Sequence, residues 1–315
     1  MYSFLEISGI LFLVSLLTYL IPTFWLKFRG VQNLKKKYPG AEWALVTGGS
    51  SGIGRAIVEK LASQGFNVVI VAYPDKFLDS SFSEYQTMFP HLKFRKIPAN
   101  LADPSFMTDL IDKTKDITIS CLFNNAGYIK TGFFAETQVE AQMANHNCNA
   151  TAVLQITHHY VRLMQEKKIK GCVTFTSSPA GFMPCPFSVM YGSTKTYLTL
   201  FAMSLAPEIR SDGIDVCVVH PSPVASRFYE KTHSLDALIF FKNTATGPES
   251  IANALFATIG RSVVRDQGYY PTAVKVLLKI IDINFLADII SMTASSLGDF
   301  KNMKKESQIA QTKAK

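Results

Sequence analysis

The sequence predicts an α/β fold in which one doubly wound parallel sheet follows an N-terminal transmembrane helix. Three observations carry this prediction. Short apolar, β-branched runs alternate with helical patterns from residue 42 onward. A glycine-rich turn directly follows the first of these runs. Residues 7–26 form an uncharged, strongly apolar stretch ahead of them.

The apolar stretch at residues 7–26 is long enough to cross a bilayer. Helical residues rise ~1.5 Å each, so this stretch spans the ~30 Å hydrocarbon layer. A cleaved signal peptide is the alternative, but it would carry positive charge before the apolar run and small residues after it. Here Glu6 precedes the run, and Phe24, Trp25 and Leu26 close it. We therefore expect an uncleaved anchor, with residues 1–37 forming the anchor and its basic flank.

The charge distribution argues against a nucleic-acid partner. The chain has 315 residues and a formal net charge of +8. The positive excess lies in residues 27–37 and 301–315, whereas the body between them is nearly neutral. A basic stripe interleaved with aromatic residues, as nucleic-acid binding needs, is absent from the sequence. A basic flank after the anchor stays in the cytosol by the positive-inside rule, so the membrane protein should present its domain there.

Six strand candidates lie within residues 38–270, which we assign to the single folded domain. The second of them is a continuous apolar run, as is typical of a strand buried on both faces. The strands are expected at Trp43–Thr47, Asn67–Ala72, 92–98, 117–123, Gly171–Thr176 and 214–220. Helices are expected at 53–64, after residue 103, at 136–168 and at 189–211. Right-handed crossovers between such strands produce a doubly wound sheet with helices on both faces.

The C-terminal part has a different pattern. Residues 271–300 are apolar but are interrupted by Lys275, Lys279, Asp282 and Asp288. This predicts an amphipathic helix lying in the membrane interface, and packing on the domain or on a dimer partner is the alternative. Residues 301–315 form a basic tail.

The cysteines and histidines predict reduced thiols and no metal site. The five cysteines form no CxxC pair and no ligand spacing with histidine, which is typical of a reducing compartment. The six histidines include no HExxH pattern.

A dinucleotide-binding turn is predicted where the first strand ends. The glycines there are spaced G-x-x-x-G-x-G from Gly48 to Gly54. Glycine lets the backbone approach a pyrophosphate closely, and the N-terminus of the following helix offers free N–H groups and a positive dipole end. An ordinary tight turn is the alternative. The candidate cofactor-binding residues here are Thr47, Gly48, Ser50, Ser51, Gly52, Ile53, Gly54 and Arg55.

Tyr191 and Lys195 stand four residues apart, so on a helix they share one face. An ammonium near a phenol favours the phenolate and lowers its pKa from about 10 toward the working range. Such a phenol can give a proton to a carbonyl oxygen or take one from an alcohol. A surface Tyr–Lys pair is the alternative. Ser178 argues against it, because this serine follows the fifth strand at the sheet edge where open α/β folds bind ligands.

The motifs T-G-x-x-x-G-x-G, N-N-A-G, a serine and Y-x-x-x-K, in this order, resemble those of the short-chain dehydrogenase/reductase family. The resemblance covers about residues 40–260 and implies a Rossmann-like NAD(P)-dependent oxidoreductase. It implies that Ser178 hydrogen-bonds the substrate oxygen and that Lys195 also holds the nicotinamide ribose. Asn147 would keep a proton-relay water beside the lysine, with Asn149 as the competing choice.

The resemblance thus implies a set of reacting groups and further cofactor contacts. The implied catalytic residues are Asn147, Ser178, Tyr191 and Lys195. Besides Tyr191 and Lys195, cofactor contacts are implied at Tyr73, Asn100, Asn124, Ala126, Gly127, Pro221 and Val224.

The sequence favours NADP(H) as cofactor, with NAD(H) as the alternative. Ala72 stands at the end of the second strand, where NAD enzymes place an acid on the ribose, and Asp75 comes three residues late. Tyr73 stands where NADP-preferring relatives often have arginine, so Arg55 is the residue expected to reach a 2′-phosphate. Asn100 replaces the family's aspartate near the adenine.

The segment at 228–241 is rich in large apolar residues and by resemblance covers the substrate. Its apolar members are Phe228, Tyr229, Leu235, Leu238, Ile239, Phe240 and Phe241. Such a lid suits a lipid-like substrate, and packing on the domain or membrane is the alternative.

The anchor and the runs at residues 42–48 and 208–214 resemble one membrane-anchored branch, the very-long-chain 3-oxoacyl-CoA reductases and 17-beta-hydroxysteroid dehydrogenases. The 3-ketodihydrosphingosine reductases are also similar. The branch implies NADPH-dependent reduction of a lipid ketone at the endoplasmic reticulum membrane, and a homodimer is compatible with it. A membrane-tethered, non-catalytic Rossmann binding protein is the rival of another class, and a nucleotide-sugar epimerase is a third.

Overall fold

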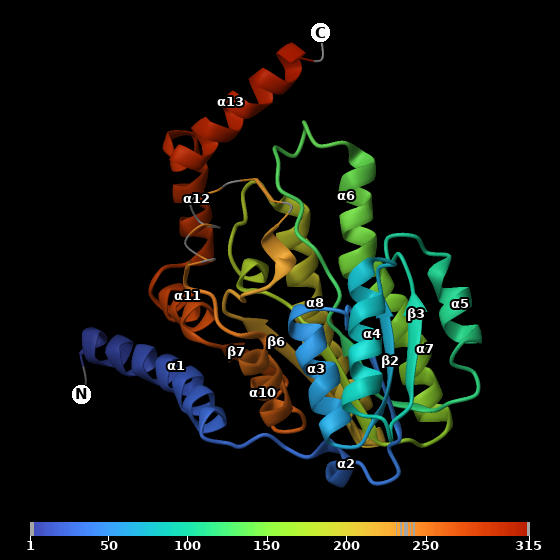
Figure 1. The fold of residues 1–315 in the computed structure, drawn as a ribbon. Coiled ribbons are helices and arrows are strands. Elements are labelled where there is room, and N and C mark those ends of the chain that lie inside the picture. The colour runs from blue at the N-terminus through green and yellow to red at the C-terminus, as the bar shows by residue number, and fades with distance from the viewer. Residues whose placement is uncertain are drawn as a thin grey trace.

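Seven parallel strands form one sheet in the computed structural model, which describes residues 3–230, 232, 233, 235, 239, 241 and 243–313 (Figure 1). The strand order is β3-β2-β1-β4-β5-β6-β7. The strands are β1 Trp43–Thr47, β2 Asn67–Ala72, β3 Phe94–Pro98, β4 Ile119–Asn124, β5 Gly171–Thr176, β6 Ile214–Pro221 and β7 Val264–Gln267. The predicted doubly wound fold is therefore confirmed, with β7 as a seventh strand that the sequence did not predict.

Helices cover both faces of this sheet. The helices that pack on it are α3 Gly52–Ser63, α4 Lys76–Met88, α5 Phe106–Asp112, α7 Ala152–Glu166, α8 Val189–Ile209 and α10 Pro248–Thr258. One buried cluster joins the sheet to α3, α4 and α10, and the other joins it to α5, α7 and α8. Alternate residues of β1 point into the two clusters, since Ala44 and Val46 lie in the first and Leu45 in the second.

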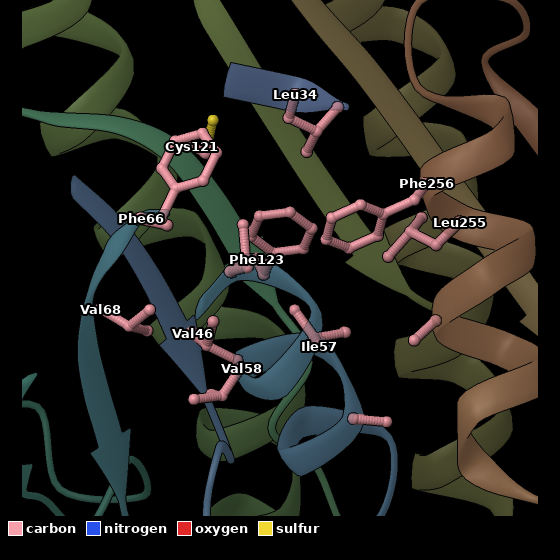
Figure 2. Close-up of a cluster of buried hydrophobic side chains, with 14 of the residues drawn as sticks. Leu34, Val46, Ile57, Val58, Phe66, Val68, Cys121, Phe123, Leu255 and Phe256 are labelled. Carbon is pink, nitrogen blue, oxygen red and sulfur yellow. The ribbon is translucent and has the colours of Figure 1, made fainter. Parts of the chain in front are cut away.

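The first cluster is centred on stacked aromatic rings (Figure 2). Phe123 of β4 and Phe256 of α10 stack with ring centroids 5.6 Å apart. Both side chains are fully buried, and burial of a phenylalanine contributes about 1.5–3 kcal/mol. This packing fixes the carboxyl ends of the strands, where the site lies.

The long helix predicted at residues 136–168 is interrupted. The structure has α6 Val139–His146, a π-helical turn at Asn147–Thr151, and then α7. A π turn adds one residue to the helical repeat and changes which side chains face the neighbouring helix. This irregularity decides which asparagine reaches the site.

The apolar N-terminal stretch forms one helix, α1 Phe4–Lys27, with a mean hydropathy of 2.1. Among the described residues it is the one helix that is long and apolar enough to cross a membrane. Its last turns dock on the domain: the Tyr19 hydroxyl donates to Asp266 at 3.0 Å, and Arg265 donates to the Thr23 carbonyl at 3.1 Å. A short helix, α2 Leu34–Lys37, follows before β1.

The C-terminal part forms three helices, α11 Tyr269–Ile280, α12 Ile283–Thr293 and α13 Gly298–Lys313. In Figure 1 these helices stand at one side of the sheet, and α1 lies beside α11. Met303 of α13 is buried against Leu235 of the segment after β6. The large apolar residues left exposed on α11 and α12 are Tyr269, Leu277, Ile280, Ile283, Phe285, Ile289 and Met292.

Candidate active site

The glycine turn after β1 forms an open cradle at the N-terminus of α3. A Cβ on Gly54 would lie 2.1 Å from the Gly48 carbonyl oxygen, and Gly48 itself has a φ of +68°. Ser51 occupies the N-cap of α3 without a side-chain cap, so N–H groups of the first turn remain available to an anion. Ser50 and Ser51 have no hydrogen-bond partner for their hydroxyls among the described residues. The cradle therefore fits a pyrophosphate.

The end of β4 holds this cradle in place. The Thr47 hydroxyl accepts from the backbone N–H groups of Asn125 and Ala126, both at 3.0 Å. The Asn125 amide in turn donates to the Thr47 carbonyl at 3.1 Å. Thr47 thus joins two strands instead of facing a cofactor. Asn125, which was not among the predicted site residues, holds the glycine turn through these bonds to Thr47.

Asn124 does not face the cradle. Its side chain is buried and donates to the Thr157 hydroxyl of α7 at 3.0 Å. Its predicted contact with a cofactor through the side chain is therefore not supported by its placement. Gly127 lies beside the catalytic lysine: a Cβ there would come 3.1 Å from the Asn149 Oδ1 and 3.4 Å from the Lys195 Nζ.

Tyr191 and Lys195 lie on the buried face of α8, at the carboxyl edge of the sheet. Tyr191 is 7% exposed, and Ser178 lies close enough to its hydroxyl to affect its pKa. The Lys195 ammonium donates to the Thr176 carbonyl at 2.8 Å and lies 5.5 Å from the centre of the Tyr191 ring. The ring of Phe228 packs 5.7 Å from that of Tyr191. The structure thus brings together the three groups predicted to react.

The predicted lowering of the phenol's pKa by Lys195 is wrong for this state of the protein. Burial raises the pKa of Tyr191 above its ordinary value, and the nearby Ser178 hydroxyl only partly opposes this. Burial also lowers the pKa of Lys195 to about 8, so its side chain is still mostly protonated at neutral pH. A neutral phenol beside a mostly protonated amine is therefore the resting arrangement, and this is the form that can donate a proton.

Asn149, not Asn147, approaches the lysine. Asn149 is fully buried in the π turn, its Oδ1 accepts from the Tyr128 N–H at 3.1 Å, and its Nδ2 donates to the Tyr128 carbonyl at 2.9 Å. The Asn147 amide instead donates to the Ala102 carbonyl at 3.3 Å. The geometry therefore favours the choice that the sequence analysis kept as the competitor.

Replacing Asn149 by alanine is expected to lower the turnover number about 10- to 100-fold, because a buried amide that fixes the loop beside Lys195 is lost. Asn147→Ala is the matched control and should retain near-normal turnover. Steady-state kinetics of both variants checks this. A larger loss from Asn147→Ala than from Asn149→Ala would restore the original assignment.

A chain of hydrogen bonds connects α1 to α8, the helix that carries Tyr191 and Lys195. The Asp266 carboxylate accepts from the Tyr19 hydroxyl and contacts the His220 Nδ1 at 2.6 Å. The His220 Nε2 lies 2.9 Å from the Thr199 hydroxyl, which donates to the Lys195 carbonyl at 2.9 Å. No local sequence pattern predicts this chain of hydrogen bonds, since its members come from four separate segments.

The adenine end of the cradle differs from the prediction. The Arg55 guanidinium pairs with Glu59 at 2.8 Å and with Glu84 at 2.6 Å, so its charge is already compensated. Tyr73 is 63% exposed beyond β2. Asp75 caps α4 by accepting from the Phe77 and Leu78 N–H groups.

Asn100 lies after β3, and its Oδ1 accepts from the Ala102 N–H at 3.2 Å. It is exposed at the same edge of the sheet as the glycine turn, so its placement agrees with a position near an adenine. Its amide nitrogen remains available to a ligand among the described contacts.

At the other end, the loop after β6 closes toward the cradle. Pro221 ends β6 beside Gln267 of β7, and Val224 is buried and paired with Thr246. Ser222, which replaces the family's glycine, accepts from the Tyr270 N–H at 3.2 Å. The serine therefore ties this loop to the start of α11.

The described part of the lid is aromatic. Phe228 and Tyr229 form a T-shaped pair 5.2 Å apart, and Phe241 packs 4.9 Å from Tyr270. Leu235 is buried and Ile239 is exposed. Leu238 and Phe240, which were predicted to belong to the lid, lie outside the described residues.

The fold and the Ser–Tyr–Lys arrangement beside a dinucleotide cradle define a nicotinamide-dependent oxidoreductase. The chain belongs to the short-chain dehydrogenase family, whose sequence profile matches residues 42–236. It is 32% identical over 256 residues to the very-long-chain 3-oxoacyl-CoA reductase of Macaca fascicularis, covering 78% of this chain and 77% of that protein. The human protein of the same name is 31% identical over equal coverage.

Solved structures show the same fold. A 7beta-hydroxysteroid dehydrogenase superposes with a TM-score of 0.71 at 22% identity, covering 81% of this chain and 100% of that one. A short-chain dehydrogenase from Sphingobium yanoikuyae in complex with NADPH gives 0.67 at 22% identity, covering 78% and 96%. One from Burkholderia phymatum in complex with NAD gives 0.68 at 19% identity, covering 78% and 94%.

Proposed function

We propose that this protein uses NADPH to reduce the ketone of a long-chain, lipid-like substrate, with a 3-oxoacyl-CoA as the first candidate. The carrying observation is the buried, neutral Tyr191 phenol under an aromatic lid. The names of the relatives support this substrate class. The apolar anchor supports delivery from a membrane, which we propose to be that of the endoplasmic reticulum, with the domain in the cytosol.

Each residue of the site has a separate role in the proposed reduction. The nicotinamide, when bound, supplies a hydride to the carbonyl carbon. Ser178 orients the carbonyl oxygen by hydrogen bonding, and Tyr191 gives that oxygen its phenolic proton. The raised pKa of Tyr191 keeps this proton in place until the oxygen becomes basic. Lys195, whose ammonium lies beside the ring, then stabilises the phenolate that is left.

Oxidation of the alcohol and reduction of a keto-sphingoid base are second candidates. Among the described residues, the site has no group that would select one type of lipid chain over another. The test is NADPH consumption by the detergent-solubilised protein with 3-oxoacyl-CoAs of increasing length, keto-sphingoid bases and ketosteroids. We expect turnover to rise with acyl chain length. Absence of turnover with every ketone would favour the non-catalytic binding protein.

For the NADPH preference, we propose Arg227 in place of Arg55. The Arg227 guanidinium lies 3.4 Å from the ring centre of Phe77, in the first turn of the helix after β2. Its neighbour Ser226 lies 3.2 Å from the position of a Cβ on Gly52, so the segment crosses the cradle. Among the described residues Arg227 forms an ion pair only with Glu230, and the two side chains are 40% and 55% exposed. Such a pair contributes about 0–1 kcal/mol, so a 2′-phosphate can replace it.

Arg227→Ala is expected to raise the KM for NADPH about 10- to 100-fold and to leave the KM for NADH nearly unchanged, because a charge-assisted contact to the phosphate is lost. Arg55→Ala serves as the matched arginine control and should change both KM values alike. Equal effects of Arg227→Ala on the two cofactors, or a native preference for NADH, would contradict the assignment.

A further inference from the structure

A cavity of about 690 Å³ lies where the anchor helix meets the domain, away from the reacting groups. Its walls come from the end of α1, the linker after it, α10, the end of β7 and the start of α11. The walls are held by hydrogen bonds: the Gln32 amide donates to the Ile259 carbonyl at 2.8 Å, and Arg261 donates to the Gly30 carbonyl at 3.1 Å. The cavity is therefore a built feature of the fold.

The cavity is cationic. Lys27, Arg29 and Arg265 line it, whereas Asp266 is its one acidic residue. That carboxylate is already engaged by Tyr19 and by a buried histidine. The start of α11 also lines the cavity and adds the positive end of a helix dipole. The balance of charge therefore favours an anion.

The polar groups of the cavity wall are incompletely paired. Arg265 is 8% exposed, and its guanidinium makes one hydrogen bond within the described residues, to the Thr23 carbonyl. Its Nε and the Gln267 Oε1 are buried without a partner among those residues. An incompletely paired, largely buried cation beside the cavity favours an anionic ligand there.

Part of the remaining wall is apolar and comes from the end of α1 and the linker after it. Phe24, Leu26 and Val31 line the cavity, and Phe24 is 51% exposed on the outer face of α1. Trp25 and Arg29 stack at 4.6 Å at the same level. Tryptophan and basic residues at the end of an apolar helix mark the depth of lipid headgroups. An acyl chain along α1 would place its phosphate at the mouth of this cavity.

We propose that this cavity binds the phosphate of an anionic phospholipid headgroup. The inference rests on the proposed membrane anchoring. It assigns a second ligand site, distinct from the cradle and from Tyr191. The shared chemistry is a phosphate group, and the alternative source is a soluble phosphate.

The test uses the full chain in an uncharged detergent, with native mass spectrometry after addition of phosphatidic acid or of phosphatidylcholine with the same acyl chains. We expect one phosphatidic acid retained per chain, in preference to phosphatidylcholine and in the presence of excess inorganic phosphate. Equal retention of the two lipids would overturn the proposal. Full displacement of the lipid by inorganic phosphate would show that the site binds a soluble phosphate instead of a lipid headgroup.

Two variants and a matched control make the test specific. Arg29→Gln removes a cation of the cavity, and Ala254→Trp fills the cavity without changing charge; each should reduce phosphatidic acid retention about fivefold or more. Lys36→Gln changes charge equally on the same basic flank but outside the cavity, and it should retain the lipid. An equal loss in Lys36→Gln would show non-specific attraction. Lipid binding is measured without turnover, so failure of this test would leave the proposed reduction unaffected. Likewise, failure of the proposed reduction would leave the proposed lipid site unaffected.

Discussion

Tyr191→Phe is expected to lower the turnover number by about 10²- to 10⁴-fold, because it removes the proton donor and little else. The phenylalanine ring fills the same buried volume against Phe228, so the fold should persist. The affinity for NADPH should change little, because the cradle lies on other elements. Steady-state NADPH consumption measures the first quantity, and NADPH fluorescence titration measures the second.

Tyr197→Phe is the matched control for this variant. Tyr197 lies on the same helix, is 36% exposed and stacks on Phe201 at 5.5 Å. It should turn over normally. If Tyr191→Phe kept more than a small fraction of the native rate, the phenol would not be the proton donor, and the proposed mechanism would be lost.

Gly54→Ala is expected to weaken NADPH binding by about 10- to 100-fold, because the added methyl has no space. Its carbon would lie 2.1 Å from the Gly48 carbonyl oxygen and 2.6 Å from the Asn125 Nδ2. Overpacking of this kind costs about 1–3 kcal/mol, and here the displaced atoms form the cradle itself.

Fluorescence titration with NADPH measures this loss, and thermal unfolding without cofactor separates it from a general loss of stability. Gly9→Ala is the control, because nothing lies within 4 Å of its added carbon. Native affinity in Gly54→Ala would mean that the pyrophosphate binds elsewhere.

The apolar strands could be predicted from the sequence because burial on both faces requires continuous β-branched runs. β7 could not, since its four residues read V-R-D-Q. Arg265 and Asp266 are buried there with a carbonyl and a phenol of α1 as partners. Those partners lie more than two hundred residues away in the sequence, and no local pattern predicts them.

The sequence contains two candidates for the asparagine of the site, and periodicity could not decide between them. Asn147 and Asn149 lie about 200° apart around a regular helix, so only one of them can face Lys195. The π turn at Asn147–Thr151 alters that phase. Where a helix takes up its extra residue depends on the helix packed against it, and this lies outside local sequence.

The cofactor preference shows a similar limit. Arg55 follows the glycine turn and looked free to meet a phosphate, but Glu84 arrives from α4 and pairs with it. Arg227 stands far along the chain and reaches Phe77 only because the loop after β6 folds across the cradle. Charges could be counted from the sequence, whereas their pairing could not.

The contact between Tyr19 and Asp266 bears on how this enzyme should be prepared. Apolar N-terminal helices are commonly cut away to obtain soluble protein for crystals and kinetics. Here that cut would leave a buried carboxylate short of a donor, three hydrogen bonds from the backbone of the reactive lysine. Rate constants measured on a trimmed protein would then describe a perturbed catalyst, so the intact chain in detergent or nanodiscs is the proper reference.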